Sequence, residues 1–154
     1  MPSLNEIKTF PYSAQKIHEL VMDIEKYPDF LPWCKQAKII ERASSGQLTA
    51  DLLINFKNFF EKYRSEVKHG KHGAGLYFIE TRAIDGPFRS LFSSWKIREL
   101  ENEKCEVEFF IEFQFNSFIL EKMIGGIFEK AALKMIQSFE SRAHGLFSEQ
   151  IKRL

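Results

Sequence analysis

Apolar and polar residues alternate along the middle of the chain with a period of two, which is typical of β-strands. The alternation is cleanest in residues 105–115, where apolar side chains occupy every second position and Glu106, Glu108 and Glu112 lie between them. Residues 48–56 show the same pattern. One face of the expected sheet is therefore buried and the other mostly exposed to solvent, which indicates an antiparallel sheet covered on one side.

Similar runs extend over most of the chain. The pattern predicts strands at residues 4–10, 37–42, 48–56, 59–67, 76–82, 91–100 and 105–115. A first helix is expected after Ser13, a candidate N-cap, because Ile17 and Leu20 begin an apolar stripe at helical spacing.

After Asn116 and Ser117, a cap-like pair, the last part of the chain has helical periodicity. From residue 118 to about 147 the stripe consists of Leu120, Ile124, Ile127, Phe128, Ala131, Met135 and Phe139. An unbroken helix of this length would measure about 45 Å. Gly125 and Gly126 interrupt it, and they predict either a tolerated defect or a bend or close approach over a cavity.

The economical arrangement of these elements is an α+β fold. It has a curved antiparallel sheet of about seven strands around a long C-terminal helix, which leaves room for a hollow between them. We expect residues 1–147 to form a single domain and residues 148–154 to form a C-terminal tail, because no linker or repeat divides the sequence.

Residues 27–34 break the regular pattern. Pro28 and Pro32 disfavour a regular helix or a central strand there, yet Phe30, Leu31 and Trp33 are large apolar side chains. Such a segment either tucks its side chains into the core or offers them to an apolar partner.

In an antiparallel meander, successive connections alternate between the two ends of the sheet, a rule that we call hairpin parity. It places this segment at the same end of the sheet as three other connections, at residues 57–60, 85–88 and 116–119. All four carry aromatic or large aliphatic residues, and we call this the apolar end; the turns at 44–46, 69–73 and 101–104 are polar or glycine-rich and share the opposite end. The apolar side chains either plug the core or form a lipophilic mouth that touches membrane. Basic residues near this end either meet anionic lipid headgroups or a polar ligand head, or they are ordinary solvated positions on the outer face of the sheet. These residues are Lys57, Lys62, Arg64 and Arg89.

Composition narrows the functional classes. The chain has 154 residues and a formal net charge of +1, which gives no overall electrostatic basis for binding nucleic acid. Cys34 and Cys105 are expected to be reduced thiols. We expect a cytoplasmic protein, because no secretion signal and no apolar stretch of roughly 18–20 residues is evident.

No grouping of residues indicates catalysis. Cys34 has no evident histidine partner, and His69 and His72 have no third ligand spaced to complete a metal site. We therefore expect a protein that is not an enzyme, with neither a metal nor a resident cofactor.

Residues 27–34 resemble the signature loop of the coenzyme Q-binding START-domain family, whose bacterial members are often called ribosome association toxin RatA or polyketide cyclase. Residues 85–89 followed by Trp95 are similar to the second signature, and residues 113–116 with 127–129 to the third. The resemblance covers roughly residues 3–147. It implies a helix-grip fold, START/Bet v 1-like, with a lipophilic tunnel between the sheet and the long helix.

The resemblance also implies a function. It suggests that the chain binds ubiquinone or a similar prenylated lipid as a non-catalytic carrier for respiration or quinone synthesis, near the cytoplasmic face of the inner membrane. The ligand-binding residues expected on this basis are Phe30, Leu31, Pro32, Trp33, Phe56, Phe59, Phe88, Trp95, Phe115, Ile124, Ile127 and Phe128. The toxin name implies the alternative, a protein that blocks the joining of ribosomal subunits; a contiguous basic face would favour it, whereas positive charges here alternate with Glu61, Glu66, Glu99 and Glu101.

Overall fold

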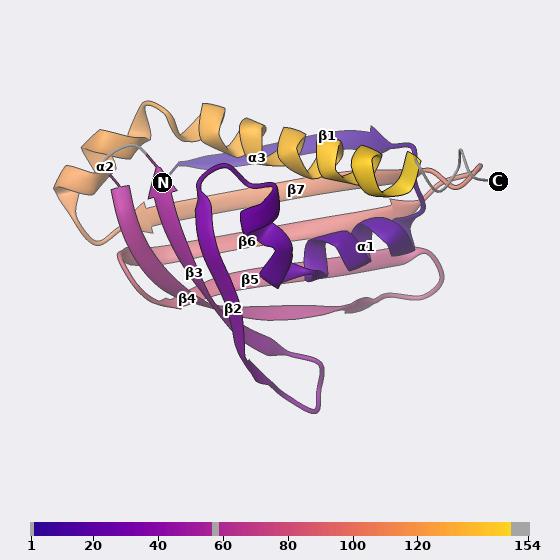
Figure 1. Ribbon diagram of the computed structural model, residues 1–154, viewed down its shortest axis with the longest axis horizontal. Coiled ribbons are helices and arrows are strands. Elements are labelled where there is room, and N and C mark those ends of the chain that lie inside the picture. The colour runs from indigo at the N-terminus through magenta and orange to yellow at the C-terminus, as the bar shows by residue number, and fades with distance from the viewer. Residues whose placement is uncertain (1, 57–58, 149–154) are drawn as a thin grey trace.

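The computed structural model describes residues 2–56 and 59–148. Its strands form one antiparallel sheet in the order β1-β7-β6-β5-β4-β3-β2 (Figure 1). The strands are β1 Ser3–Phe10, β2 Cys34–Arg42, β3 Leu48–Phe56, β4 Phe59–Lys71, β5 Leu76–Asp85, β6 Phe88–Glu99 and β7 Cys105–Phe115. All strands that follow the first helical region pair with their sequence neighbours, and β1 returns to the free edge of β7. The expected meander is confirmed.

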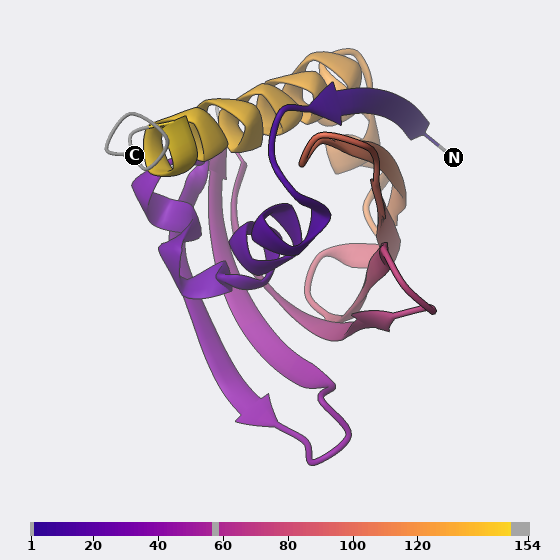
Figure 2. The same ribbon diagram turned by 90° about the vertical axis from the view of Figure 1, so that its right-hand side faces the viewer.

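The sheet is strongly curved. Figure 2 shows it bending around α1 (Ala14–Met22), while α3 (Phe128–Ala143) lies across its open side. The remaining helical elements are a 3₁₀ helix at Ile24–Asp29, the short helix α2 (Phe118–Gly125) and a π-helical turn at His144–Ser148. This is the helix-grip arrangement expected from the sequence.

Both predicted helix caps are present. The side chain of Ser13 accepts a hydrogen bond from the Lys16 amide at 3.3 Å, and that of Ser117 accepts one from the Leu120 amide at 3.4 Å. A serine at this position satisfies one of the amide groups that lack a partner in the first turn of a helix. The caps fix where α1 and α2 begin.

Of the alternatives that the sequence left open for the glycine pair, the structure shows a bend. The helix divides at the glycine pair, with α2 ending at Gly125 and α3 beginning at Phe128, so α3 measures only about 24 Å. A β-carbon added to Gly125 or Gly126 would meet no atom within 4 Å, which excludes close approach as the reason for the glycines. Their effect is the bend between α2 and α3 (Figure 1).

Strand boundaries differ from the sequence pattern mainly at the apolar end. The structure extends β5 to Asp85 and begins β6 at Phe88, so the pairing continues to a tight hairpin at Gly86 and Pro87. Gly86 has φ 131° and an added β-carbon would lie 2.6 Å from the Tyr63 β-carbon. Glycine is therefore required here, and it allows the hairpin to pack closely on β4.

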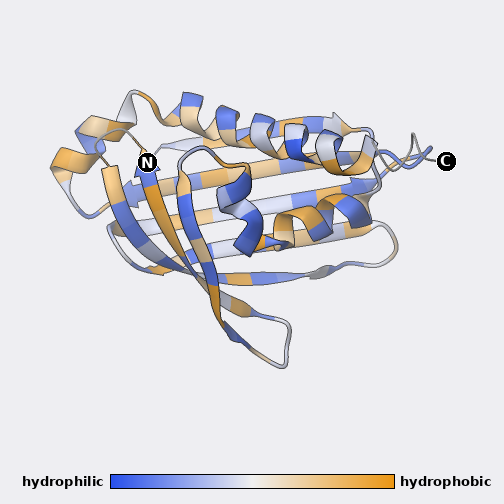
Figure 3. Ribbon diagram, viewed as in Figure 1, coloured by the Kyte–Doolittle hydropathy of each residue, from blue (hydrophilic) through white to orange (hydrophobic). Residues whose placement is uncertain are grey.

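The apolar interior has two parts. The larger cluster surrounds α1 and α3 and contains Ile17, Ile97, Phe109, Ile136 and Phe139. The smaller cluster lies at the apolar end, where Phe59, Phe113 and Phe115 pack with partly buried residues of β6, α2 and α3. In Figure 3 the apolar positions of the strands alternate with polar ones along the sheet. Among residues 2–56 and 59–148, no helix is long and apolar enough to cross a membrane.

Candidate functional site

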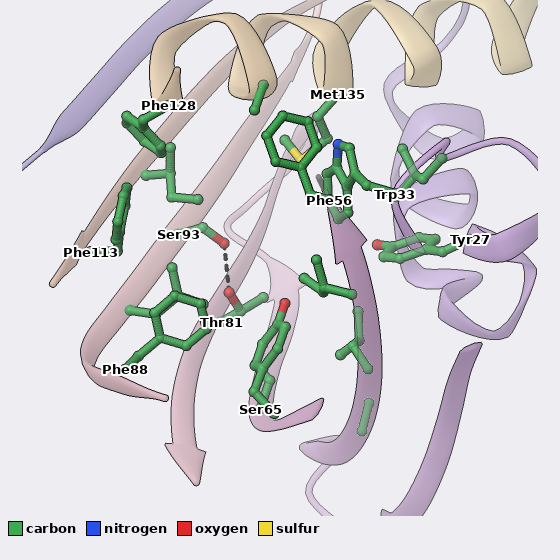
Figure 4. Close-up of a pocket in the computed structure, with 18 of the residues that line it drawn as sticks. Tyr27, Trp33, Phe56, Ser65, Thr81, Phe88, Ser93, Phe113, Phe128 and Met135 are labelled. Atoms are coloured by element: carbon green, nitrogen blue, oxygen red, sulfur yellow. Dashed lines mark hydrogen bonds between the residues drawn. The ribbon is translucent and has the colours of Figure 1, made fainter. Parts of the chain in front are cut away.

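A cavity of about 210 Å³ lies between the concave face of the sheet and α3 (Figure 4). Its lining is mostly aromatic and aliphatic. The residues expected at the site that do line it are Leu31, Trp33, Phe56, Phe59, Phe88, Trp95, Phe115, Ile124 and Phe128. A hollow in this place agrees with the lipophilic mouth and argues against a core that is plugged throughout.

Three of the expected residues lie elsewhere. Phe30 packs edge-on against Phe139, with ring centroids 5.1 Å apart, and the Arg142 guanidinium lies 5.3 Å from its ring centroid. Pro32 is exposed, and Ile127 is a half-buried N-cap of α3. Leu31 and Trp33 line the cavity, whereas Phe30 packs against α3 without lining the cavity and Pro32 is exposed.

Strand periodicity positions most of the lining. Inward side chains of β3 and β7 line the cavity at successive alternate positions, as Ala50, Leu52, Ile54 and Phe56 do on β3. At the apolar end, Phe88 stacks on Phe115 with ring centroids 5.0 Å apart, and Phe59 lies 5.4 Å from Phe115. The β5–β6 hairpin, the β7–α2 connection and the ends of β3 and β4 gather on the side that carries α2 (Figure 1). Residues 57 and 58 of the expected apolar end lie outside the described part of the chain.

The proline-containing segment is anchored at both ends. The Tyr27 hydroxyl donates a hydrogen bond to the Val21 carbonyl, and Tyr27 itself lines the cavity. Leu31 is only 2% exposed and belongs to the larger core cluster. Within this segment, Leu31 therefore completes the core, and Trp33 forms part of the cavity wall.

Three polar residues also line the cavity, and sequence reasoning missed them. Ser65, Thr81 and Ser93 come from the adjacent strands β4, β5 and β6, and Ser65 and Ser93 are buried. The Thr81 and Ser93 hydroxyls share a hydrogen bond of 2.6 Å (Figure 4). One signal was available: Ser93 stands between Leu91 and Trp95 on the apolar face of its strand.

The basic residues near this end are directed to the outer face of the sheet. Arg64 donates two hydrogen bonds to Asp51, at 2.8 and 3.2 Å, and Lys62 lies 3.4 Å from the same carboxylate. The hydrogen bond from Arg64 lowers the pKa of Asp51. Arg89 is exposed, and Lys57 lies outside the described residues. Two of the four cations are thus paired with a neighbouring carboxylate.

Reactive groups are scarce around the cavity. Burial raises the pKa of the Cys34 thiol to about 11, so this group is a weak nucleophile at neutral pH. His69 contacts His18 with 3.3 Å between their ring nitrogens, and His72 stacks on Phe78. Within the part of the chain that the structure describes, no three His, Cys, Asp or Glu side chains form a metal-binding group.

The size of the cavity limits what it holds in this conformation. An apolar cavity of about 150 Å³ accommodates benzene. A cavity of about 210 Å³ therefore has room for one substituted ring or a short branched chain, but not for a long lipid tail. A larger ligand must leave part of its length outside.

Comparison with known proteins agrees with this geometry. Residues 10–140 match the family described as polyketide cyclase / dehydrase and lipid transport. The chain is 42% identical over 143 residues to the ribosome association toxin RatA of Rickettsia prowazekii, a match that covers 93% of this chain and 97% of that protein. It is 24% identical over 150 residues to the mitochondrial coenzyme Q-binding protein COQ10 homolog B of Xenopus laevis, covering 95% of this chain and 59% of that protein.

The fold of the chain is also similar to that of a solved structure. A START superfamily protein from Mycobacterium smegmatis superposes with a TM-score of 0.80 at 17% identity, over 94% of this chain and 98% of that one. The family match covers most of the chain, and the RatA relative exceeds two-fifths identity over nearly its whole length. The chain belongs to the polyketide cyclase / dehydrase and lipid transport family, among its RatA-type, START/Bet v 1-like members.

Proposed function

We propose that this protein binds ubiquinone or a similar prenylated quinone in the cavity and carries it without altering it. The observation that supports this most directly is the cavity between the sheet and α3, whose lining is mostly aromatic and aliphatic. The relative named for coenzyme Q binding supports the choice of ligand class. In this proposal the quinone is cargo, and no resident cofactor is needed.

Transfer energetics favour an exchangeable carrier over a tight receptor. Burying one five-carbon isoprene unit from water is worth about 4 kcal/mol. A quinone tail, however, leaves a bilayer that is already apolar, so its transfer into the cavity yields little net free energy. Shape and contacts to the ring then set the affinity, and the ligand exchanges readily.

Exposed apolar residues beside the cavity support contact with a membrane. Phe118 and Ile119 at the start of α2 are 73% and 70% exposed, and Phe60 on β4 is 62% exposed. Large apolar side chains gathered on a surface mark a docking site for an apolar partner. We propose that this end rests on the bilayer from which the quinone is taken.

Extraction provides the test. The protein purified from its native host is treated with organic solvent, and the extract is analysed by mass spectrometry. We expect a prenylated quinone at less than one equivalent per chain, because exchange during purification removes part of it. Repeated recovery of folded protein with no prenylated quinone would contradict the proposal.

A second candidate function rests on the RatA relative, which is named as a ribosome association toxin. The described surface offers it limited support, because Lys62 and Arg64 pair with Asp51 and Arg98 pairs with Glu106 at 2.5 Å. Sucrose-gradient profiles of ribosomal subunits with and without added protein test whether the chain blocks subunit joining. Loss of the joined ribosome peak would establish this activity, and an unchanged profile would remove it.

A further inference from the structure

The polar residues of the cavity have hydrogen-bonding capacity that the protein does not use. Thr81 and Ser93 each carry one hydroxyl proton and two acceptor lone pairs. Their shared hydrogen bond of 2.6 Å consumes one of the two protons. Among the described residues no acceptor takes the other, so the pair retains one donor that faces an apolar cavity.

The indole of Trp33 presents a second unused donor. Its Nε1 atom is buried and has no hydrogen-bond partner in the described part of the chain. A buried donor without a partner destabilises the fold, and native proteins rarely retain one without a reason. The Trp33 side chain also lines the cavity, and in Figure 4 it is drawn apart from the Thr81–Ser93 pair.

The hydroxyl pair lies well inside the molecule. Ser93 is five residues along β6 from Phe88, which borders the apolar end, so the two are separated by roughly 16 Å of extended strand. The surroundings are aromatic and aliphatic. In such surroundings a hydrogen bond to a ligand is stronger than in water, and an unpaired donor is more costly.

We infer that the Thr81–Ser93 pair is a recognition site for an acceptor oxygen on the ring of the ligand, which enters the cavity ring first. This inference rests on the proposed function and adds the orientation of the ligand and the chemistry of its head. A ring with carbonyl or ether oxygens satisfies the free hydroxyl donor, whereas a hydrocarbon does not. The tail then leaves through the apolar end towards the bilayer.

Two features of the cavity agree with this orientation. Its volume of about 210 Å³ suits one substituted ring and excludes a long chain. The Trp33 indole, which belongs to the cavity wall, offers a second donor to a ring that carries several oxygens. Both features favour an oxygen-bearing ring as the buried part.

A double variant, Thr81→Val with Ser93→Ala, tests the inference because it removes both hydroxyls and nearly preserves shape. Replacing both partners of a buried hydrogen bond is close to neutral for stability, so the variant should unfold at the same urea concentration as the wild type or a higher one. Ser94→Ala is the matched control, because Ser94 is the next residue of β6 and lines a depression on the outer face with Lys96 and Glu108.

Two probes distinguish recognition of the quinone ring from binding of the isoprenoid tail. Ubiquinone-2 carries the ring and two isoprene units, and farnesene is a terpene hydrocarbon with no oxygen. Dissociation constants are measured by quenching of tryptophan fluorescence for ubiquinone-2 and by competition with it for farnesene. We expect the double variant to bind ubiquinone-2 about tenfold more weakly, the loss of about one hydrogen bond. Its affinity for farnesene should stay within about twofold, and Ser94→Ala should match the wild type with both probes.

The outcomes separate the two proposals. If the double variant binds ubiquinone-2 as tightly as the wild type, or loses affinity equally for both probes, ring recognition by the pair is refuted while quinone binding stands. If the wild type binds neither probe, the proposed function itself fails, and the inference fails with it.

Discussion

The carbonyl of Trp33 accepts a hydrogen bond from the amide of Asn55 at 2.8 Å. This bond ties the proline-containing segment to the end of β3, where Phe56 also lines the cavity. The hydrogen bond holds the backbone of this segment beside the cavity. The position of the Trp33 ring at the cavity is a consequence of backbone pairing as well as of apolar packing.

Filling the cavity should abolish ligand binding without unfolding the protein. Ala131 on α3 lines the cavity, and Ala131→Phe places a ring in the space assigned to the ligand. We expect the affinity for ubiquinone-2 to fall at least tenfold, while the free energy of unfolding stays within about 1–2 kcal/mol of the wild type, because the added ring gains contacts in an existing hollow. Fluorescence titration and urea unfolding measure the two quantities.

The control for this substitution is Lys130→Phe, one residue earlier and on the exposed surface of α3. It adds a ring of the same kind outside the cavity and should leave the affinity unchanged. Equal affinity of Ala131→Phe and the wild type would show that the ligand binds elsewhere.

The glycine pair that divides the C-terminal helix should be replaceable. Gly126 has helical geometry with φ −79°, and a β-carbon at Gly125 or Gly126 would meet open space. Alanine at both positions should raise the free energy of unfolding by about 1–2 kcal/mol, because it restricts the unfolded chain and favours helix. Thermal unfolding followed by circular dichroism provides the measurement. A lower melting temperature would mean that the bend between α2 and α3 is required for packing.

Both thiols should be inert while the protein is folded. Burial raises the pKa of Cys34 to about 11 and that of Cys105 to about 12, so neither is appreciably ionised at pH 8. We expect Ellman's reagent to modify neither cysteine in native protein and both in urea. Rapid labelling of Cys34 in the native state would show that the segment before β2 opens.

The Asp51 cluster should stabilise the fold in a pH-dependent manner. Because hydrogen bonding by Arg64 lowers the pKa of Asp51 in the folded state, its contribution is complete above the unfolded value of about 3.9 and is lost as pH falls through the folded value. Asp51→Asn should therefore lower the urea midpoint at pH 7, and the difference from the wild type should shrink below about pH 4. A difference that stays constant with pH would contradict this account of the ion pair.

The proposed membrane contact includes the start of α2. Phe118→Glu should weaken binding to vesicles of phosphatidylcholine and phosphatidylglycerol severalfold in a co-sedimentation assay, because it places a charge where an apolar ring meets the bilayer. Stability should not change, since Phe118 is 73% exposed. Ile7→Glu is the control, because Ile7 is 57% exposed on β1, away from α2. Equal vesicle binding by both variants and the wild type would remove α2 from the interface.

Most of the fold could be predicted from the sequence because its signals are local. Strict alternation identified β3 and β7 with their observed boundaries, and Ser13 and Ser117 marked two helix starts. The division between α2 and α3 was ambiguous, because a glycine pair costs helix stability without stating whether packing will compensate. The 3₁₀ helix at Ile24–Asp29 contains Pro28, and such tight turns lack a periodic signal.

The candidate site was predictable only in part. Hairpin parity brought Phe59 and Phe88 to one end, which needs only the order of the strands, whereas Phe115 was expected from the family resemblance. It could not separate Phe30 from Leu31, since inward and outward directions in an irregular segment depend on contacts distant in sequence. Thr81 and Ser93 were missed for a different reason: isolated hydroxyls on strands become a site only when pairing of β5 with β6 sets them side by side.

The central claim is that a prenylated quinone occupies the cavity between the sheet and α3. Its most direct test is a titration of ¹⁵N-labelled protein with ubiquinone-2, followed by amide chemical shifts. The account predicts saturable shifts at cavity-lining positions of β3 to β7 and α3, with Thr81 and Ser93 among the largest. Shifts that are absent, or confined to the outer face around Asp51 and Arg64, would contradict it.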